Sequence, residues 1–407
     1  MSNIPKIRFK GFTEEWEQRK LGDISDIKTG PFGSTLHADD YVSDGTPIIT
    51  TEHFKTGTLP QSKNGLPQVS DADYKRLTAY TLADGDIVFS RVGSVDINAL
   101  ITPFQSNWLF SGRVLRVRPQ TDILSQFLHT RLETESIKTD IRARAVGQTM
   151  PSINTEILKI TTLALPTLAA EQEQIGSYFA TIDHLITLHQ RKYDEITELK
   201  KYMLKKMFPA KGKNTPEIRF TGFTEDWEQR KFSDIAARES SIYTSSSDIP
   251  SVEYEDVVAE EGRLNKDVRS KEAVKSGIIF DGSQVLYGKL RPYLHNWLNP
   301  DFKGIAVGDW WVLKPINTDK NFLYRLIQTQ QFDNIANQSS GSKMPRADWN
   351  LISDSEFMIS LSKEEQSKIG DYFNSLDHLI TLHQQKLDEL TELKKYMLQN
   401  MFPKKEG

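Results

Sequence analysis

Two stretches of the chain carry apolar residues at the spacing of one face of a long helix. The positions that recur every seven residues are Ile175, Ile182, His189, Ile196 and Met203 in the first stretch and Ile369, Leu376, His383, Leu390 and Met397 in the second. A second column is expected three residues further on, at Leu185, Leu199, Leu379 and Leu393, and the face is widened by Phe179, Ile186, Tyr193 and Met207. The pattern predicts two amphipathic helices, each packed lengthwise on another helix.

Both helices have recognisable ends. Ser362 and Glu365 form the pattern of a capping box at the start of the second helix, and the phrase MFP closes both helices because proline cannot continue a helical turn. Helices of about 35 residues would each be roughly 50 Å long. Since their apolar faces match, we expect the two helices to pair in a coiled-coil-like, antiparallel arrangement.

The segments between the helices follow a different pattern. Short apolar runs alternate with turns marked by glycine and proline, and they include TPIITT (46–51), GDIVFSR (85–91), SGIIF (276–280) and IAVGDWWVL (305–313). These runs predict short β-strands, and one short helical stretch is expected in each segment, near 121–139 and near 319–336. We therefore expect two similar α+β domains with irregular β-sheets.

The chain repeats itself at two different intervals. IRFKGFTEEWEQRK (7–20) returns at 218–231 with 12 of 14 positions identical, and 175–209 returns as 369–403 with 26 of 35 identical. The predicted order is a first variable domain (1–165), a first helix (166–209), a linker (210–217), a second variable domain (218–360), a second helix (361–403) and a tail (404–407). A duplication of this kind predicts an approximate two-fold symmetry within one chain.

Composition narrows the class of protein. A chain of 407 residues, of which 38% are hydrophobic and 26% charged, is long enough for two cores. It contains no cysteine, which excludes disulfides, thiolate metal sites and cysteine nucleophiles. No apolar run approaches the roughly 18 residues of a membrane span, so we expect a cytoplasmic protein without membrane contact. The net charge of −4 means that any binding to DNA must rest on local basic patches or on a partner.

Several phrases occur in the same order in both halves of the chain. They are FTEEWEQRKLGDI and FTEDWEQRKFSDI, then DGDIVFSR and VLYGKLRPY, then MPSINTEILKI and MPRADWNLIS, then LPTLAAEQEQIGSYFATIDHLI and LSKEEQSKIGDYFNSLDHLI. This order resembles the DNA-specificity subunit of type I restriction–modification systems over essentially all 407 residues. One departure is LSKEEQ, which stands where the family has a proline-containing lead like LPTLAAEQ.

The resemblance implies a division of labour. In that family each variable part is a target recognition domain that reads one half of a bipartite, asymmetric sequence in double-stranded DNA. The repeated helices form the spacer and bind two adenine-methyltransferase subunits, through which two restriction/translocase subunits join. S-adenosylmethionine, ATP and magnesium are then implied for the partner subunits, and no cofactor for this chain.

The sequence lacks the motifs of an enzyme that acts on DNA. It contains no Pro-Pro, so the loop with which adenine methyltransferases hold a flipped base is missing. GSQVLYGKL (282–290) approaches a nucleotide-binding loop but has five residues between its glycines and Leu290 where serine or threonine must meet magnesium. We expect a subunit without catalytic or metal-ligating residues. The alternatives are a stand-alone two-domain DNA-binding regulator or scaffold, which would lack methyltransferase and helicase-nuclease genes beside its own, and a self-contained nuclease.

DNA reading needs arginine, lysine or amide side chains on loops that reach base edges. The candidates are Ser34, Thr35, Arg91, Ser94, Gln148 and Thr149 in the first domain and Lys289, Arg291, Lys343 and Arg346 in the second. The stretch from Arg113 to Arg144 holds seven basic and four acidic residues, which suits phosphate contacts or, alternatively, a helix with internal ion pairs.

Two features of the helices allow more than one interpretation. His189 and His383 stand where an aliphatic residue is expected, either as a metal-binding or pH-sensitive pair or as a polar register pin hydrogen-bonded across the contact. The face away from the contact is either simply solvated or, because it is repeated, a docking site for two identical partners. That face comprises Asp194, Glu195, Glu198, Lys200 and Lys201 and their copies Asp388, Glu389, Glu392, Lys394 and Lys395.

Overall fold

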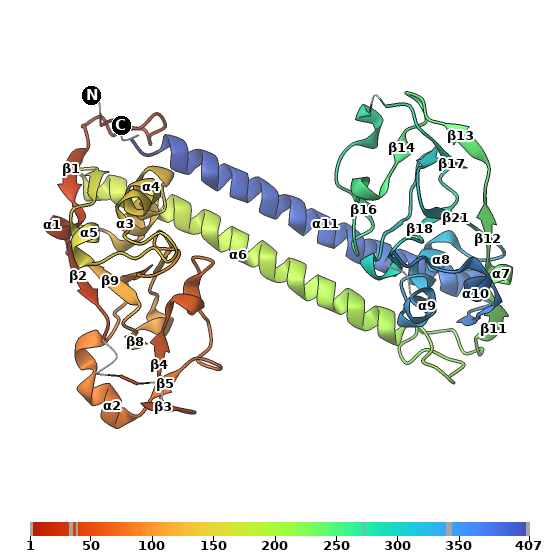
Figure 1. Cartoon of the computed structure of the whole chain (residues 1–407), viewed down its shortest axis with the longest axis horizontal. Helices are drawn as coiled ribbons and strands as arrows, with labels where there is room; N and C mark the ends of the chain where they lie inside the picture. The colour runs from red at the N-terminus through yellow and green to blue at the C-terminus, as the bar shows by residue number, and fades with distance from the viewer. Residues whose placement is uncertain (1–2, 32–35, 38–39, 272, 339–343, 404–407) are drawn as a thin grey trace. The chain divides into compact units, whose positions relative to one another are not determined.

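The computed structural model describes residues 3–31, 36–37, 40–271, 273–338 and 344–403. It divides into two compact units (Figure 1), of which unit 1 comprises Met1–Leu188 and Lys386–Gly407 and unit 2 comprises His189–Gln385. The division falls within both long helices, α6 (Ala169–Lys206) and α11 (Lys363–Asn400). Each unit therefore contains one variable domain, the beginning of the helix that follows it and the end of the other long helix.

Unit 1 is built from short strands and short helices. In chain order they are β1 (Glu17–Lys20), α1 (Leu21–Ile24), β2 (Ser25–Thr29), β3 (Tyr41–Val42), β4 (Thr46–Ile49), β5 (Gln68–Val69), α2 (Asp71–Arg76), β6 (Ile87–Ser90), β7 (Asn98–Leu100), β8 (Leu109–Phe110), β9 (Val114–Pro119), α3 (Ser125–Leu132), α4 (Glu135–Arg144), α5 (Thr155–Lys159) and β10 (Thr162–Leu165). The strand orders are β2-β9-β6-β7, β3-β5-β4-β8 and β1-β10. All four residues of β6 are buried, which fits a strand with both faces covered.

Unit 2 repeats this plan with small changes. Its elements are β11 (Glu228–Lys231), α7 (Phe232–Ile235), β12 (Ala236–Glu239), β13 (Ile242–Thr244), β14 (Ser251–Val252), β15 (Val257–Val258), β16 (Arg263–Leu264), β17 (Ser276–Phe280), β18 (Val285–Gly288), β19 (Trp297–Leu298), β20 (Gly304–Ala306), β21 (Trp310–Pro315), α8 (Lys320–Leu326), α9 (Gln330–Ala336), α10 (Trp349–Asp354) and β22 (Glu356–Ile359). The strand orders are β12-β21-β18-β19, β13-β17-β20-β14, β11-β22 and β15-β16.

The expectation of one short helical stretch per domain is wrong in detail. Each domain has two consecutive helices in that region, α3 and α4 in unit 1 and α8 and α9 in unit 2. Thr134 and Thr329 precede the second helix of each pair in extended conformation, and the Thr329 hydroxyl accepts a hydrogen bond from the backbone N–H of Phe332. The cap at Thr329 starts a new helix instead of extending α8, whereas the Thr134 hydroxyl donates to the backbone carbonyl of Arg131 at 2.8 Å.

The phrase WEQRK is repeated because its tryptophan anchors each unit. Trp16 is 2% exposed and lies edge-on to Phe402 with ring centroids 5.9 Å apart, so the MFP end of α11 packs into the core of unit 1. Trp227 and Phe208 form the same contact in unit 2, at 5.8 Å. Each MFP phrase thus closes a helix in the core of the unit that contains the other repeat's variable domain.

A buried ion pair supports this anchor in both units. Arg8 donates from Nε and Nη2 to Glu171 at 2.6 and 2.8 Å, and Arg219 pairs with Glu365 at 2.5 and 2.9 Å. The predicted capping box is therefore only half formed. Ser362 accepts from the Glu365 backbone N–H, but the Glu365 carboxylate turns inward to Arg219 because this fully buried carboxylate needs a counter-charge.

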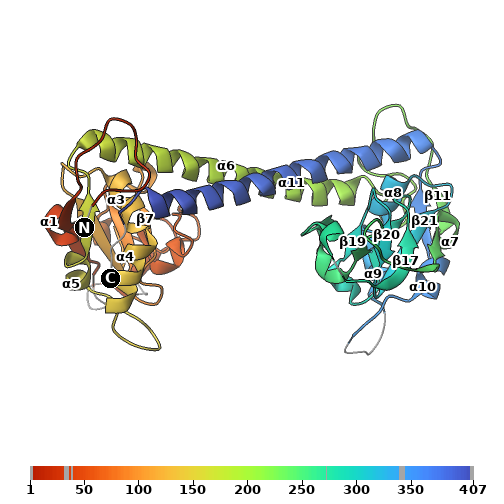
Figure 2. The same ribbon diagram turned by 90° about the horizontal axis from the view of Figure 1, so that it is seen from above.

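The long helices begin against the short ones. Helix α8 lies beside α11 (Figure 2). A Cβ atom on Gly370 of α11 would stand 2.5 Å from Asn321 of α8, and one on Gly176 of α6 would stand 3.0 Å from the backbone nitrogen of Phe127 in α3. A larger residue at either glycine would push the two helices apart. Within the described residues, none of the helices is both long and apolar enough to span a membrane.

The contact between α6 and α11 differs from the predicted seam in its second column. Leu199, Leu379 and Leu393 are 43%, 39% and 41% exposed, and so they do not belong to the contact. The inward column stands four residues after the first, where the side chains are wholly or partly buried. It contains Phe179, Ile186, Tyr193 and Lys200 in α6, with Met207 just after its end, and Phe373, Ile380, Leu387 and Lys394 in α11, with Met401 just after its end. Spacings of four and three residues alternate, as in a heptad contact.

Candidate nucleic-acid interface

Two loops that are distant in the sequence meet in unit 1. Arg91, which follows β6, accepts a hydrogen bond from the Ile153 N–H at 2.9 Å, and the Gly93 N–H donates to Pro151 at 2.8 Å. The Arg91 N–H in turn donates to the backbone carbonyl of Arg113 at 2.9 Å. The phrases DGDIVFSR and GQTMPSIN are thereby joined into one backbone frame just before β9.

Unit 2 builds the same frame from different residues. The Ala347 N–H donates to Lys289 at 2.8 Å, the Arg291 N–H to Pro345 at 2.7 Å, and the Lys289 N–H to Asp309 at 2.9 Å. Lys289 thus takes the place of Arg91, and Arg291, with a φ of 50°, takes the place of Gly93, with a φ of 84°.

Two further side-chain positions follow from this match of hydrogen bonds. Arg113 in unit 1 corresponds to Asp309 in unit 2, and Ser152 corresponds to Arg346. We call these four residues, with Arg91 and Lys289, the frame residues. The main chain of the frame is common to both units, while its charges are not.

In unit 1 the frame borders an open groove of about 240 Å³. Arg113 and Ser94 are exposed along it, and its lining also includes Lys55, which forms an ion pair with Glu52. Arg91 is only partly exposed, because its guanidinium donates to the carbonyl of Gly112 at 3.0 Å. A groove with exposed cations and a hydroxyl suits phosphate or base contacts. The Arg91 guanidinium stabilises the frame through its hydrogen bond to Gly112.

In unit 2 the cations of the frame gather around one carboxylate. Arg346 donates from Nε and Nη2 to Asp309 at 3.2 and 3.0 Å, and Lys289 Nζ lies 3.5 Å from it. The hydrogen bond from Arg346, opposed by partial burial and aided by both positive charges, lowers the pKa of Asp309 below its usual value. The same pair raises the pKa of Arg346.

The remaining predicted DNA-binding residues are distributed as follows. Gln148 and Thr149 are exposed on the loop that enters the frame of unit 1. Ser34, Thr35 and Lys343 lie outside the described residues. Arg291 has a buried Nε without a hydrogen-bond partner in the described part of the chain, so its role in the frame is carried by its backbone.

The stretch from Arg113 to Arg144 does not form one phosphate-binding face. Arg118 pairs with the buried Asp86 at 2.7 Å, and Arg131 is 2% exposed with its guanidinium 5.4 Å from the ring centroid of Phe402. Arg142 pairs with Asp96 at 2.7 Å and Arg144 with Asp140 at 2.9 Å. The pair of Arg144 with Asp140 within α4 is the internal helical ion pair of the alternative interpretation, whereas Arg118 and Arg142 pair with carboxylates elsewhere in the chain.

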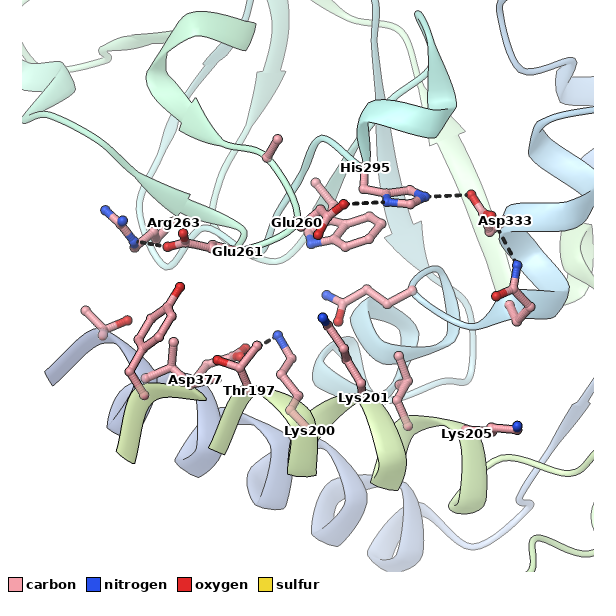
Figure 3. Close-up of a pocket in the computed structure, with 18 residues that line it drawn as sticks. Thr197, Lys200, Lys201, Lys205, Glu260, Glu261, Arg263, His295, Asp333 and Asp377 are labelled. Carbon is pink, nitrogen blue, oxygen red and sulfur yellow. Dashed lines mark hydrogen bonds and ion pairs between the residues drawn. The ribbon is translucent and has the colours of Figure 1, made fainter. Parts of the chain in front are cut away.

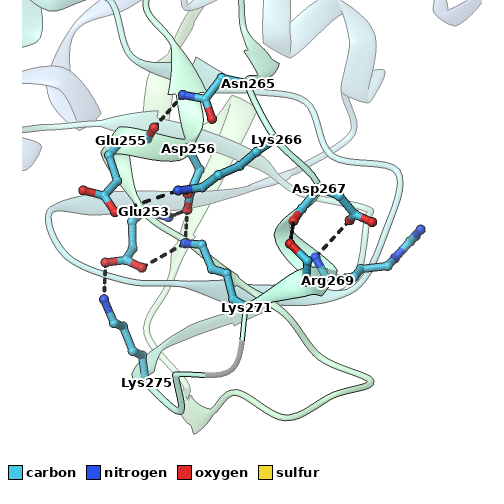
Figure 4. Close-up of polar contacts among 10 residues, drawn as sticks. Glu253, Glu255, Asp256, Asn265, Lys266, Asp267, Arg269, Lys271 and Lys275 are labelled. Carbon is cyan, nitrogen blue, oxygen red and sulfur yellow. Dashed lines mark hydrogen bonds and ion pairs between the residues drawn. The ribbon is translucent and has the colours of Figure 1, made fainter.

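Unit 2 also contains an ionic cluster that the sequence did not reveal. Glu253 and Asp256 are surrounded by lysines (Figure 4): Lys271 lies 2.9 Å from Glu253 and also contacts Asp256, and Lys266 lies 3.0 Å from Asp256. Lys275 also contacts Glu253. These lysines neutralise the two carboxylates and thereby connect residues 253–256 with residues 266–275. We therefore assign them a structural role.

The two seam histidines meet directly. Both belong to unit 2, and their Nδ1 atoms lie 2.9 Å apart, which is a hydrogen bond if one ring carries a proton on Nδ1. Burial, the neighbouring His189 and Lys192 lower the pKa of His383. This direct contact is what the register-pin interpretation predicts, and a pH-sensitive pair is compatible with it.

Lys200 and Lys394 are not on a solvated face as expected. In unit 2, Lys200 pairs with Asp377 at 2.6 Å, and the same carboxylate binds the buried Arg325 at 2.7 Å. In unit 1, Lys394 pairs with both Asp183 and Glu133 at 2.8 Å. Burial lowers the pKa of Lys200, whereas two carboxylates outweigh burial and raise the pKa of Lys394.

A cavity of about 740 Å³ opens beside this ion pair in unit 2 (Figure 3). Helix α6 supplies lysines on one side, while Glu260 and His295 lie on the opposite side. Its charged lining consists of Lys200, Lys201, Lys205 and Arg263 together with Glu260, Glu261, Asp333 and Asp377, and also includes His295. Because the arginine and lysine charges balance the carboxylates, the cavity favours neither an anion nor a cation.

The near match to a nucleotide-binding loop does not have the required shape. The residues between Gly282 and Lys289 include the strand β18, all of which is buried. A phosphate needs a loop of free backbone N–H groups, which a paired strand cannot offer.

Comparison with known proteins gives a consistent result. A family model described as "Type I restriction modification DNA specificity domain" matches residues 13–198 and again 224–392. A putative type I restriction enzyme MjaX specificity subunit of Methanocaldococcus jannaschii is 28% identical over 237 residues, which are 56% of this chain and 54% of the relative. The MjaVIII specificity subunit of the same organism is 24% identical over 206 residues, 49% of this chain and 46% of the relative. The chain thus spans about half the length of these relatives.

One solved structure is similar over its whole length. The S subunit of a type-I restriction-modification system from M. genitalium matches with a TM-score of 0.69, covering 99% of this chain and 100% of that chain. At 15% sequence identity this similarity establishes the fold.

Proposed function

The chain belongs to the family of type I restriction modification DNA specificity domains, and we propose that it is a non-catalytic subunit that reads a bipartite DNA target. Each variable domain reads one half-site of double-stranded DNA. The two family-model matches, one in each half of the chain, support this division.

The observation that carries the proposal is the frame that occurs in both units. Its backbone hydrogen bonds are the same, yet three equivalent positions hold Arg91, Arg113 and Ser152 in one unit and Lys289, Asp309 and Arg346 in the other. A fixed main chain with exchanged side chains is what two readers of different sequences require. Side chains on loops specify bases, while the scaffold keeps them in place.

A second feature supports a scaffold role. On α6 in unit 2, Leu199 and Tyr202 are 43% and 53% exposed, and on α11 in unit 1 their repeats Leu393 and Tyr396 are 41% and 55% exposed. We infer that each apolar pair docks one methyltransferase subunit, because identical surfaces bind identical partners. Restriction/translocase subunits join through these partners, which also hold S-adenosylmethionine, ATP and magnesium.

The docking idea is tested by Tyr202→Ala and Tyr396→Ala. Each single variant should retain one of two methyltransferase copies, and the double variant should retain none, as measured by native mass spectrometry of the co-expressed complex. Phe104→Ala is the control, since Phe104 is also 49% exposed but lies in a variable domain. Equal loss in the control would contradict the assignment.

The recognition function is tested by expressing the chain with the methyltransferase encoded beside it and sequencing the modified adenines. We expect one asymmetric motif made of two defined blocks separated by unspecified bases. A single contiguous motif, or no methylation that depends on this chain, would refute the proposal.

A further inference from the structure

Asp309 forms an ion pair with Arg346, whose side chain is exposed on the surface of unit 2. Its carboxylate accepts two hydrogen bonds from Arg346, at 3.2 and 3.0 Å, while the Arg346 side chain remains 55% exposed. The arginine uses Nε and one hydrogen of Nη2 in this pair, so that Nη1 and the second hydrogen of Nη2 stay available. An exposed edge with two parallel N–H groups is the shape that matches O6 and N7 of guanine.

The main chain of Asp309 is fixed by its surroundings. The Tyr254 hydroxyl donates to the backbone carbonyl of Asp309 at 2.5 Å and accepts from the Leu290 N–H at 3.0 Å. Tyr254 also lies edge-on to the buried Trp310, with centroids 4.6 Å apart. Asp309 is therefore anchored to the core at its main chain, and Arg346 is anchored to Asp309.

Unit 1 has no equivalent arrangement at its frame. Arg113 takes the place of Asp309, which inverts the charge at that position, and Ser152 takes the place of Arg346, which removes the charge there. Arg113 lines the groove of unit 1, where it occupies the position that Asp309 has in unit 2. This difference lies in the side chains alone, since the backbone hydrogen bonds agree.

A carboxylate at a DNA interface weakens binding, so its presence there calls for a compensating benefit. It repels phosphates and, with no partner, would weaken binding to every sequence. Paired with arginine, it restricts the rotamers of a long side chain and so reduces the entropy lost when a base is bound. This gain offsets the repulsion of phosphates, and the net benefit is specificity, because a guanidinium fixed in one orientation cannot adapt to a wrong base.

We propose that Asp309 is a positioning residue that sets base preference in the half-site of the second variable domain by fixing the orientation of Arg346. The base that Arg346 reads presents two acceptors in the major groove, which makes it guanine. This inference rests on the proposed function, and it adds the residues and the base that one domain uses.

The test is selection from a pool of random DNA duplexes with the full chain co-purified with the methyltransferase encoded beside it, comparing the wild type with Asp309→Asn. The amide keeps the size but loses the charge that holds the guanidinium. We expect the preference for guanine at one position to fall by roughly 5- to 150-fold, the range of one bidentate base contact. Arg346→Ala should relax the same position, and Asp309→Glu should retain more of the preference than Asp309→Asn.

Asp354→Asn is the matched control, because Asp354 also pairs with a lysine of unit 2, Lys231, at 3.4 Å but lies outside the frame. Its motif should be unchanged. If Asp309→Asn gave the wild-type motif, or relaxed positions in both blocks, the role assigned to Asp309 would be wrong. If the wild type enriched no motif at all, the proposed function itself would fail.

Discussion

At the scale of single residues, the frame shows which parts of the site can be predicted. Arg91, Lys289 and Arg346 were identified because they stand in phrases that recur in both halves. The sequence does not single out Asp309 or Arg113 as members of the frame. Each stands just before a strand and outside any recurring phrase, and the two residues have opposite charges. Only the backbone hydrogen bonds from Lys289 and Arg91 reveal that they are equivalent.

The histidine pair gives a prediction about pH. His383 has a lowered pKa in the folded chain, so the fold favours the neutral ring. The corresponding stability is present above the unfolded pKa of about 6.5 and is lost as the pH falls below it, because the unfolded chain then binds more protons.

We therefore expect the melting temperature of the wild type to fall more steeply between about pH 7 and pH 5.5 than that of His383→Gln, which cannot be protonated. His378→Gln is the control, since His378 is exposed on the same helix. Calorimetry at several pH values makes the comparison. Parallel curves for the wild type and His383→Gln would exclude the pair as a source of pH dependence.

At the scale of elements, the contact between α6 and α11 shows what the seven-residue periodicity of the sequence can predict and what it cannot. The seven-residue repeat correctly placed Ile175, Ile182, Ile369 and Leu376 inward. The second column of such a contact can lie either three or four residues after the first. The position three residues on carries leucines, whereas the position four residues on includes Lys200 and Lys394, so hydrophobicity alone favours the wrong column. Those lysines are tolerated inside because Asp377 and Asp183 neutralise them.

Asp377→Asn tests the importance of this pair. The substitution leaves Lys200 and the buried Arg325 without their shared carboxylate, and we expect a loss of about 2–4 kcal/mol in the free energy of unfolding, because an unpaired charge is then buried. Asp371→Asn, at an exposed position of the same helix, should change stability by less than about 0.5 kcal/mol. Urea denaturation followed by circular dichroism measures both, and equal stability of the two variants would contradict the structural role.

At the scale of the whole molecule, the duplication explains why some phrases are kept and others are not. WEQRK and MFP are retained because Trp16 with Phe402, and Trp227 with Phe208, close the two cores in the same way. The variable domains share one sheet order, β2-β9-β6-β7 in unit 1 and β12-β21-β18-β19 in unit 2, but they differ in the order of the second sheet and in their side chains. The sequence could therefore indicate the domain plan but not the bases read. A residue-to-base assignment depends on loop geometry that has no code in the sequence.

The helices also lead to a prediction about target length. Because their contact alternates spacings of four and three residues, inserting one heptad at equivalent points of both helices preserves the contact. Each helix then grows by about 10 Å, close to three base pairs at about 3.4 Å each. Sequencing of methylated DNA should show unchanged half-sites with a gap longer by about three bases. An unchanged gap would argue against the helices as the spacer.

The most direct measurement compares methylation motifs of two variants, Arg91→Ala with Arg113→Ala and Lys289→Ala with Arg346→Ala, each co-expressed with the neighbouring methyltransferase. If each variable domain reads its own half-site through its frame, the first variant alters one block of the motif and the second alters the other block. If both variants relax the same block, or both blocks equally, one domain does not read one half-site and the account is wrong.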